Sequence, residues 1–456
     1  MKVANIPAQA AVVGRRLDAS YFLSPGVAAG QRVAQLERSG VPTVTVAGDN
    51  GVGTVAPTSR TKRLYAGSGE VGVPYLRPYD VFDYLPQSAD ILADDDVSQS
   101  LRPTSGTIMQ TCSGRNLGPL AYADEYIAQF AVSDDMLRLT IGDEQMRMYV
   151  LACLLSPTGQ ALLRRSKTGA VIDHLSAGAL ASVRLPLLQD GAFERISTTM
   201  GSAVAKRERG RLELQTLVSD YSSRYPLAAR VALLRDGFTL TRDAIDSRLD
   251  VAFYDPSVEN ARRDLLATGG APFGEVGRAF MPPRYVRVYV DAGHGRPVIS
   301  GRQLGQATPV NLRYLAEHSI EISLFELSEG WIVFGGEGRA DERLGIPSMV
   351  TAERSGWLAS EHVMRLVPTD PATAGWLFLA FSIPAVQGQV KAIPCGSVID
   401  ELQPRDLIEV ILPPVDIELG RQALAAWRLL DEANSLELGA KDDFESCITA
   451  ALGDAV

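Results

Sequence analysis

This chain of 456 residues has little of what defines disulfide-rich, metal-binding or membrane proteins. Its four cysteines are widely scattered, which excludes a disulfide framework and a zinc knuckle, so we interpret them as buried or free thiols in a reducing cytoplasm. The apolar stretches are short and interrupted, so we expect neither a membrane span nor a signal peptide. The four histidines lack metal-ligand spacing, which predicts no metal site. With 46% hydrophobic and 21% charged residues, we expect a folded protein of two or three domains.

Positive charge is in the minority, with 44 Lys and Arg against 54 Asp and Glu and a net charge of −10. Because phosphate contacts need a basic surface, this balance argues against a nucleic-acid partner unless the positive charges are clustered. They do cluster: at Arg60, Lys62 and Arg63; at Arg164, Arg165 and Lys167; at Lys206, Arg207, Arg209 and Arg211; and more loosely from Arg278 to Arg302. Solvated faces explain such clusters equally well, so composition leaves the partner open.

Motifs of catalysis are also lacking. The stretch closest to a methyltransferase loop, Met281-Pro-Pro-Arg284, has no amide or carboxylate to hold a target amino group. Gly67–Gly72 has the glycine spacing of a dinucleotide-binding motif, but Val73-Pro74 follows at the point where that motif requires the start of a helix. Gly48–Thr54 is rich in glycine but has no lysine for a phosphate loop. We therefore predict that the chain has no catalytic residue.

What the chain does contain is an internal repeat. Residues 133–188 align without a gap on residues 360–415, with 15 identities in 56 positions at an offset of 227. The most similar stretch, Gly169–Leu175, returns as Gly396–Leu402. Three further pairs recur at this offset: Arg138 and Leu139 as Arg365 and Leu366, Pro157 and Gln160 as Pro384 and Gln387, and Leu185 and Pro186 as Leu412 and Pro413. A duplication of about half the chain therefore dominates its organisation.

Two further segments match at other offsets. Arg16-Leu-Asp18 recurs as Arg248-Leu-Asp250 at an offset of 232, and Gly106-Thr-Ile-Met109 parallels Gly330-Trp-Ile-Val333 at an offset of 224. The changing offset means that the halves differ in the lengths of the loops between shared framework segments. Two recognition surfaces of different specificity would need such a framework with variable loops, although duplication of any binding domain would produce the same pattern.

Local patterns predict an α+β fold. Short β-like runs broken by glycine and proline occur at 41–46, 71–76 and 285–290, and a helix-like stretch follows in each half, at 144–165 and 373–391. Beyond each repeat, an amphipathic helix is predicted, from 189 to about 221 and from 416 to the C-terminus. The basic residues 206–211 interrupt the first apolar stripe, and Gly210 weakens it.

Neither long helix has enough apolar surface to be stable alone. We expect the two to pair as an antiparallel coiled coil that separates two similar domains, and the alternative is that each helix covers its own domain. The ordered motifs that support this arrangement are Arg16-Leu-Asp18, Val73–Asp80, Gly106–Met109, Ser113–Gly118, Leu137–Leu139, Gly169–Leu175 and Leu185-Pro186. In order and in duplicate, they resemble the target recognition domains of specificity subunits from type I restriction-modification systems.

The resemblance covers nearly the whole chain and implies two target recognition domains, residues 1–188 and 226–415, with a central spacer helix at 189–225 and a C-terminal one at 416–456. Such a subunit is not an enzyme. It reads one half of a split double-stranded DNA target with each domain and docks DNA adenine methyltransferase subunits, with an ATP-dependent restriction subunit in the complete enzyme. S-adenosylmethionine, ATP and Mg would then be bound by the partners and no cofactor by this chain, in a prokaryotic cytoplasm without membrane attachment.

Base edges are read by Arg, Asn or Gln on loops, so polar loop residues that differ between the halves are the candidates for DNA contact. These are Arg77, Tyr79, Arg115 and Asn116 in the first half and Arg302, Gln303, Arg339 and Arg343 in the second, with Arg164 and Lys167 as candidate phosphate contacts. The second half is more divergent, with Val298-Ile-Ser-Gly-Arg-Gln303 where the first has Tyr75–Asp80. A duplicated protein-binding scaffold and an unrecognised nuclease are the alternative functions.

Overall fold

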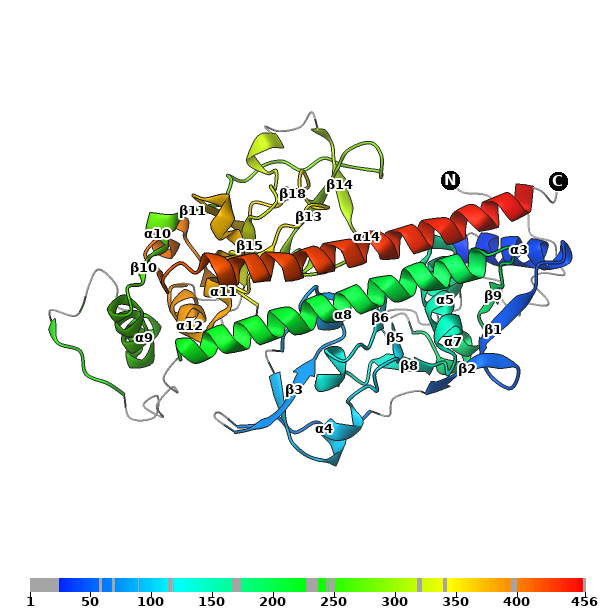
Figure 1. The fold of residues 1–456 in the computed structure, drawn as a ribbon, viewed down its shortest axis with the longest axis horizontal. Coiled ribbons are helices and arrows are strands. Elements are labelled where there is room, and N and C mark those ends of the chain that lie inside the picture. Colours follow the sequence, from blue (N-terminus) through cyan, green and yellow to red (C-terminus); the bar gives the residue numbers. More distant parts are fainter. Residues whose placement is uncertain are drawn as a thin grey trace. The chain divides into compact units, whose positions relative to one another are not determined.

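A computed structural model describes residues 24–56, 60–67, 70–88, 90–113, 117, 119–165, 174–226, 237–242, 245, 251–317, 322–338, 343–394 and 400–453, apart from the side chain of Arg302. Both Arg-Leu-Asp motifs lie outside these residues. The chain divides into unit 1, which comprises 1–82, 86–208 and 432–456, and unit 2, which comprises 83–85 and 209–431. Figure 1 labels their elements. The predicted domain boundaries at residues 188, 225 and 415 stay predictions.

Unit 1 combines sheets and helices, in agreement with the predicted α+β class. Its elements are α3 (Pro25–Arg38), β1 (Thr43–Ala47), β2 (Gly51–Ala56), β3 (Gly72–Leu76), η1 (Asp80–Phe82), β4 (Asp90–Ala93), α4 (Asp96–Ser100), β5 (Ile108–Thr111), β6 (Leu120–Tyr122), η2 (Ile127–Gln129), β7 (Ala131–Val132), β8 (Met136–Thr140), α5 (Glu144–Leu155), α6 (Pro157–Arg165), α7 (Ala177–Ala181), β9 (Arg184–Pro186) and the first part of α8 (Ala192–Arg224). A larger sheet has the order β6-β5-β8-β2-β1-β9, and a smaller one the order β4-β3-β7.

Unit 2 has the same mixture. Its elements are η5 (Val251–Tyr254), α9 (Pro256–Ala267), β10 (Ala271–Pro272), α10 (Phe273–Val276), β11 (Gly277–Phe280), β12 (Tyr289–Val290), β13 (Arg296–Ile299), η6 (Gly301–Leu304), β14 (Arg313–Leu315), η8 (Ile322–Leu324), β15 (Ile332–Gly335), β16 (Glu337–Gly338), β17 (Ser348–Met349), β18 (Leu358–Ala359), β19 (Val363–Pro368), η9 (Pro371–Thr373), α11 (Ala374–Ser382), α12 (Pro384–Ala392), β20 (Asp400–Glu401), α13 (Pro404–Leu407), β21 (Ile411–Leu412) and the part of α14 up to residue 431 (α14, Ile417–Gly453). Two four-stranded sheets have the orders β11-β19-β15-β17 and β12-β14-β13-β18.

Corresponding strands pair in the same register in the two units. In unit 1, Ile108 of β5 lies opposite Leu139 of β8, and in unit 2, Ile332 of β15 lies opposite Leu366 of β19. These partners are related by the two offsets, 224 and 227, that the sequence alignment contains. The identical residues therefore occupy equivalent places in the two sheets.

The repeated arginine next to this pair has a structural task. The Arg138 guanidinium donates hydrogen bonds to the carbonyl oxygens of residues 100–102, and the fully buried Arg365 donates to those of Phe325, Ala359, Ser360 and Val363. Burial lowers the pKa of Arg365 to about 10. Because each guanidinium satisfies several backbone carbonyls around it, these arginines hold the framework together.

Each helix-like stretch is two helices and not one. The breaks lie at Ser156, before Pro157, and at Ile383, before Pro384, and both residues are extended. Proline disfavours helical geometry in the residue before it, so the prediction of single helices at 144–165 and 373–391 was wrong. In both units a glutamine bridges the break, since the Gln160 amide donates to the Leu154 carbonyl at 2.8 Å and that of Gln387 donates to the Phe381 carbonyl at 2.5 Å.

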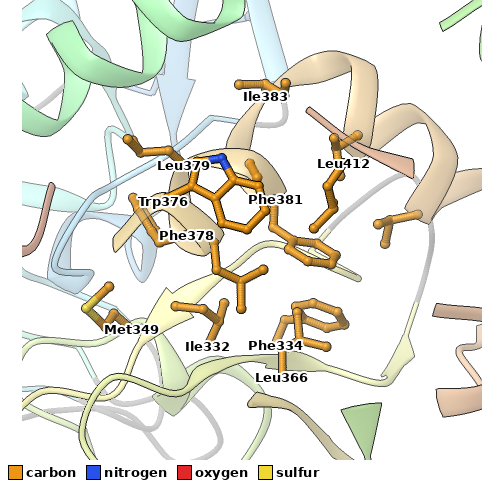
Figure 2. Close-up of a cluster of buried hydrophobic side chains, with 14 of the residues drawn as sticks. Ile332, Phe334, Met349, Leu366, Trp376, Phe378, Leu379, Phe381, Ile383 and Leu412 are labelled. Carbon is orange, nitrogen blue, oxygen red and sulfur yellow. The ribbon is translucent and has the colours of Figure 1, made fainter. Parts of the chain in front are cut away.

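The core of unit 2 lies between α11 and the sheet that contains β15 and β19. Figure 2 shows Trp376, Phe378 and Phe381 of α11 together with Phe334 of β15 and Leu366 of β19. Every residue of α11 up to Phe381 is buried, which explains the apolar run that the sequence contains there. Burial of each such side chain contributes about 1.5–3 kcal/mol, so this layer is a main source of the stability of unit 2.

The two long helices are paired within each unit. In unit 1, Arg195 and Lys206 of α8 contact Asp443 and Glu432 of α14 at 2.9 and 2.6 Å, so the two segments run antiparallel. In unit 2, a Cβ atom on Gly210 would lie 2.9 Å from the carbonyl oxygen of Ala426. Glycine at this position has no side chain, so α14 can approach α8 closely here.

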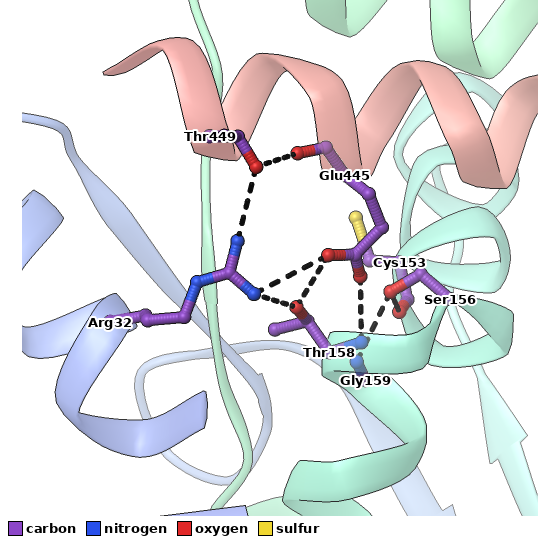
Figure 3. Close-up of polar contacts among 7 residues, drawn as sticks. All are labelled: Arg32, Cys153, Ser156, Thr158, Gly159, Glu445 and Thr449. Carbon is purple, nitrogen blue, oxygen red and sulfur yellow. Dashed lines mark hydrogen bonds and ion pairs between the residues drawn. The ribbon is translucent and has the colours of Figure 1, made fainter. Parts of the chain in front are cut away.

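Polar contacts tie α14 to α3 and α6 in unit 1 (Figure 3). The Glu445 carboxylate accepts hydrogen bonds from the backbone N–H of Thr158 at 2.6 Å and from its hydroxyl at 2.9 Å. Arg32 of α3 donates to the same hydroxyl and lies 3.5 Å from Glu445. Because Glu445 satisfies an orphan N–H at the first turn of α6, the end of α14 completes the fold of unit 1.

Candidate nucleic-acid interface

Both units expose a basic and aromatic segment at the edge of a sheet, the three-stranded sheet in unit 1 and the sheet β12-β14-β13-β18 in unit 2. In unit 1 this is residues 60–66, which hydrogen-bond to β4 through the backbone N–H of Ala66 and the carbonyl of Leu64. Arg60, Lys62 and Tyr65 are exposed, and Arg63 points inward. We call these residues the unit 1 edge segment.

The counterpart of residues 60–66 in unit 2 is residues 284–290, at an offset of 224, and we call it the unit 2 edge segment. It pairs with β14 through Tyr289, opposite Leu315, and through the carbonyl of Val288. Arg284, Val286, Val288 and Tyr289 are exposed, and Arg287 is half-buried, so the order of exposed and inward side chains is the same as in residues 60–66. An exposed tyrosine two residues after an inward arginine, Tyr65 or Tyr289, is therefore common to both units.

The inward arginine is fixed in the same way in each unit. Arg63 lies 3.7 Å from the buried carboxylate of Asp134, and Arg287 forms an ion pair at 2.5 Å with Glu361, which corresponds to Asp134 at the offset of 227. Burial by itself would raise the pKa of Glu361, but the hydrogen bond from Arg287 and its charge lower it. These pairs hold the edge segments in place, because each carboxylate comes from the framework.

The turn after the central strand also recurs. The backbone N–H of Arg77, after β3, donates to the Asp80 carboxylate at 3.0 Å, and that of Ser300, after β13, donates to the Gln303 amide oxygen at 3.2 Å. The side chains presented by these turns differ, with arginine in one and serine in the other. A common turn with different residues is the arrangement expected of a variable recognition loop.

The candidates of unit 1 are in part found in this region. The Arg77 guanidinium is 38% exposed and lies 3.0 Å from the Asp90 carboxylate, and Tyr79 is half-buried in the turn before η1. Arg164 is exposed on α6, where its Nε donates to the carbonyl of Leu117 at 3.0 Å. Arg115, Asn116 and Lys167 lie outside the described residues.

The candidates of unit 2 are more dispersed. The backbone of Arg302 and all of Gln303 belong to η6, and the Gln303 amide also donates to the Val310 carbonyl at 2.9 Å, so this side chain holds its own loop. Arg343 is paired with Asp83. Arg339 lies outside the described residues. None of the ten candidates is tested by these contacts, and each stays a prediction.

Other basic residues are committed to protein contacts. In the cluster at 206–211, Arg207 contacts Glu437 at 2.8 Å, Arg209 contacts Glu213 at 2.6 Å, and the buried Arg211 donates to the backbone carbonyls of Asp83 and Tyr84. This cluster therefore serves helix packing, although its composition alone resembles a nucleic-acid surface.

Around a concavity on unit 2, sequence reasoning identified Gln303 as a candidate but missed Tyr289 and Arg313. Arg313 of β14 stacks on the ring of Tyr289 with 4.8 Å from its guanidinium carbon to the ring centre. Burial would raise the pKa of Tyr289, but hydrogen bonds from Arg287 and Arg313 and their charges lower it. The signal that could have identified these residues is the Arg-x-Tyr pattern shared by 63–65 and 287–289.

Chemically, these surfaces offer cations, phenols and amides, which suit phosphate and base contacts. Among the described residues, no group of three or more His, Cys, Asp or Glu could hold a metal ion. In the same part of the chain, no helix has both the length and the apolar character needed to cross a membrane.

No family model and no curated protein matches the chain. Among solved structures, the S subunit of a type I restriction-modification system from M. genitalium matches 91% of this chain and 96% of its own at 12% identity and a TM-score of 0.34. The match to the HsdS subunit from Thermoanaerobacter tengcongensis covers 90% of this chain and 98% of that subunit, at 12% identity and a TM-score of 0.26. The match to a structure from work on complex assembly and conformational transition of the type I R-M system covers 91% of this chain and 98% of that chain, at 15% identity and a TM-score of 0.26. The solved structures to which the chain is similar over about nine-tenths of its length thus come from type I restriction-modification systems, the family that its motifs resemble.

Proposed function

We propose that the chain is the DNA sequence-specificity subunit of a type I restriction-modification enzyme. The observation that carries the proposal is a framework that occurs twice in the same strand register while the turns after β3 and β13 present different side chains. A protein that reads two different half-sites needs this combination, because the scaffold is common and only the reading residues change.

Base reading would come from the variable turns and loops. Arg77 and Tyr79 in unit 1 and Arg302 in unit 2 follow the central strands, and Arg115, Asn116, Gln303, Arg339 and Arg343 complete the predicted set. Arginine suits this task because its guanidinium can donate two hydrogen bonds to guanine. The edge segments are shared by both units, so they would contact phosphates, which carry no sequence information, together with Arg164 and Lys167.

The long helices would act as the spacer between the half-sites. Helix α8 has 33 residues and α14 has 37, which corresponds to rods of roughly 50 Å. The antiparallel contacts within each unit support the interpretation that the helices form a coiled coil between target recognition domains at 1–188 and 226–415. A rod of this length could separate contacts by more than one turn of DNA.

Activity would belong to the partners. The subunit would dock DNA adenine methyltransferase subunits that bind S-adenosylmethionine, and in a complete enzyme an ATP-dependent restriction subunit that uses Mg. The chain itself would bind none of these cofactors and would work in a prokaryotic cytoplasm. The absence of catalytic motifs in the sequence supports a non-catalytic role.

The test is co-expression with a DNA adenine methyltransferase subunit of a type I system, followed by sequencing of the host DNA for methylated sites. We expect a split motif. Exchange of residues 77–80 for those of another such subunit should change one half of the motif, whereas the control variant Glu213→Gln, in an exposed ion pair on α8, should leave both halves unchanged.

Two alternatives predict other results. A duplicated protein-binding scaffold would show no DNA affinity at any salt concentration and no new methylation. A nuclease would cleave DNA as the pure chain in the presence of a divalent metal. Either outcome would replace the proposed function.

A further inference from the structure

Unit 2 contains a concavity of about 290 Å³ beside the sheet of β12, β14, β13 and β18. Figure 1 labels β13 and β14, which contribute the lining residues Val298 and Arg313. The wall is polar and basic, with a single aliphatic residue, Val298. The other lining residues are Arg287, Tyr289, Ser300, Gln303, Asn311, Arg313 and Ser360. The groups that face this wall indicate what it can bind.

The hydroxyl of Ser360 is a buried polar atom at this wall. Ser360 is 1% exposed, and its Oγ has no hydrogen-bond partner within the described part of the chain. In unit 1 the equivalent serine, Ser133, is occupied, because its side chain hydrogen-bonds the phenol of Tyr75 and accepts from the backbone N–H of Asp135 at 3.2 Å. An unsatisfied buried hydroxyl is unfavourable, so a group that bonds Ser360 would stabilise unit 2.

The difference between the units comes from one position on the central strand. Tyr75 lies opposite Ala131 in β7, and Val298 lies opposite Leu358 in β18, so the two residues occupy the same register. Tyr75 is 3% exposed, and its phenol reaches Ser133. Valine is too short to do this, which leaves Ser360 without its partner and opens the space that unit 1 fills with an aromatic ring.

The charge at the concavity fits a singly charged anion. Glu361 balances Arg287. Arg313 stacks on Tyr289 and has no ion-pair partner among the described residues, so it contributes one uncompensated positive charge. Around it stand the hydroxyls of Ser300 and Ser360 and the phenol of Tyr289, which can donate hydrogen bonds to anionic oxygens.

We propose that this concavity binds one phosphate group, held by Arg313, Tyr289 and Ser360, and that the phosphate belongs to the backbone of the DNA. The second part rests on the proposed function, whereas the first part concerns the chemistry of the site alone. Unit 2 would thereby gain a phosphate contact that Tyr75 prevents in unit 1. A base is a poorer ligand, because Arg313 already covers the Tyr289 ring that would have to stack on it.

Val298→Tyr is the discriminating variant, since it gives unit 2 the residue that unit 1 has at this place. In this variant, the affinity of the full chain for inorganic phosphate, measured by phosphorus NMR, should fall at least tenfold. Arg313→Gln should have the same effect, and as an exposed change it keeps the test decisive if the tyrosine disturbs folding. Arg278→Gln, on β11, is the matched control and should bind phosphate as the unmodified chain does.

The source of the phosphate is tested with non-specific duplex DNA and the complex with its methyltransferase. Loss of one phosphate contact should reduce the slope of log affinity against log salt by about 0.9 in Val298→Tyr and Arg313→Gln. Phosphate binding that neither variant weakens would overturn the site. Loss of phosphate binding with an unchanged DNA salt slope would overturn the DNA assignment. Methylation of a split motif by a complex whose subunit binds no phosphate would overturn this inference and leave the proposed function standing.

Discussion

Glu437 on α14 is the centre of a buried ion cluster in unit 1, and its replacement by glutamine gives a quantitative test of the helix pair. The carboxylate lies 2.8 Å from the guanidinium of Arg207 on α8 and 3.1 Å from the ammonium of Lys441. Arg207 also donates to the side-chain oxygen of Asn434 at 2.9 Å. Glu437→Gln keeps the shape of the side chain but leaves two cations without their counter-charge in a buried site.

The magnitude follows from the pKa of Glu437. Burial would raise this pKa, but the charges of Arg207 and Lys441 and their hydrogen bonds outweigh burial and lower it from 4.5 to about 2. Because the folded pKa is the lower one, the stabilisation is complete above about pH 4.5 and is lost as the pH falls through about 2. The difference corresponds to about 3 kcal/mol at pH 7 and roughly half of that at pH 3. Breaking a buried pair typically destabilises a protein by about 3–5 kcal/mol, which agrees.

Hydrogen exchange of residues 192–208 and 432–453 is the appropriate assay, since it reports on this helix pair and not on the whole chain. A loss of about 3 kcal/mol lowers the protection factors roughly a hundredfold at pH 7, and at pH 3 the loss should shrink to roughly tenfold. The matched control is Glu213→Gln, which breaks the exposed pair with Arg209 and should change protection by a factor of about two. Equal effects of the two variants, or an effect of Glu437→Gln that does not depend on pH, would refute the reasoning.

Three further predictions concern urea unfolding at pH 7. Gly210→Ala places a methyl group 2.9 Å from the Ala426 carbonyl oxygen and should destabilise unit 2 by about 1–3 kcal/mol, whereas Gly439→Ala, with nothing within 4 Å, should stabilise its helix by up to about 1 kcal/mol. A Gly210→Ala variant as stable as the parent would contradict the close approach of α14. Arg365→Met removes the donor to four backbone carbonyls and should lower stability by about 3 kcal/mol. Tryptophan fluorescence would report this loss, because all four tryptophans belong to unit 2. Gln387→Leu should cost about 1–2 kcal/mol by the same assay, and an unchanged midpoint would exclude a role for its bond across the helix break.

Much of the framework could be predicted from the sequence, because its identities fall where side chains have specific structural tasks. Arg138 and Arg365 satisfy loop carbonyls, and Gln160 and Gln387 bridge helix breaks. The offsets of 224 and 227 at which these segments recur match the register of the strands. The α+β class and the two long helices followed from local periodicity, which depends on near neighbours alone.

The candidate site was less accessible to sequence reasoning. For the basic cluster at 206–211, the sequence left a nucleic-acid surface and a solvated face equally open. In the structure, Arg207 and Arg211 instead contact protein groups more than a hundred residues away in sequence. Gln303 stays a predicted base-reading residue, and only the structure shows that its amide oxygen and amide nitrogen also bond within its own loop. Which partner a polar side chain meets depends on contacts that only the folded chain creates.

The sequence by itself therefore determined the repeat, the mixed fold class and the positions of the long helices, since these rest on residue identity and local spacing. The tertiary structure alone decided where the helices break, how closely α14 approaches Gly210, and which arginines remain on the surface. It also revealed that Val298, which occupies the register position of Tyr75, lines a concavity together with Ser360. The physical reason is that burial, counter-charges and unfilled space are properties of neighbours in three dimensions, and these neighbours lie far apart along the chain.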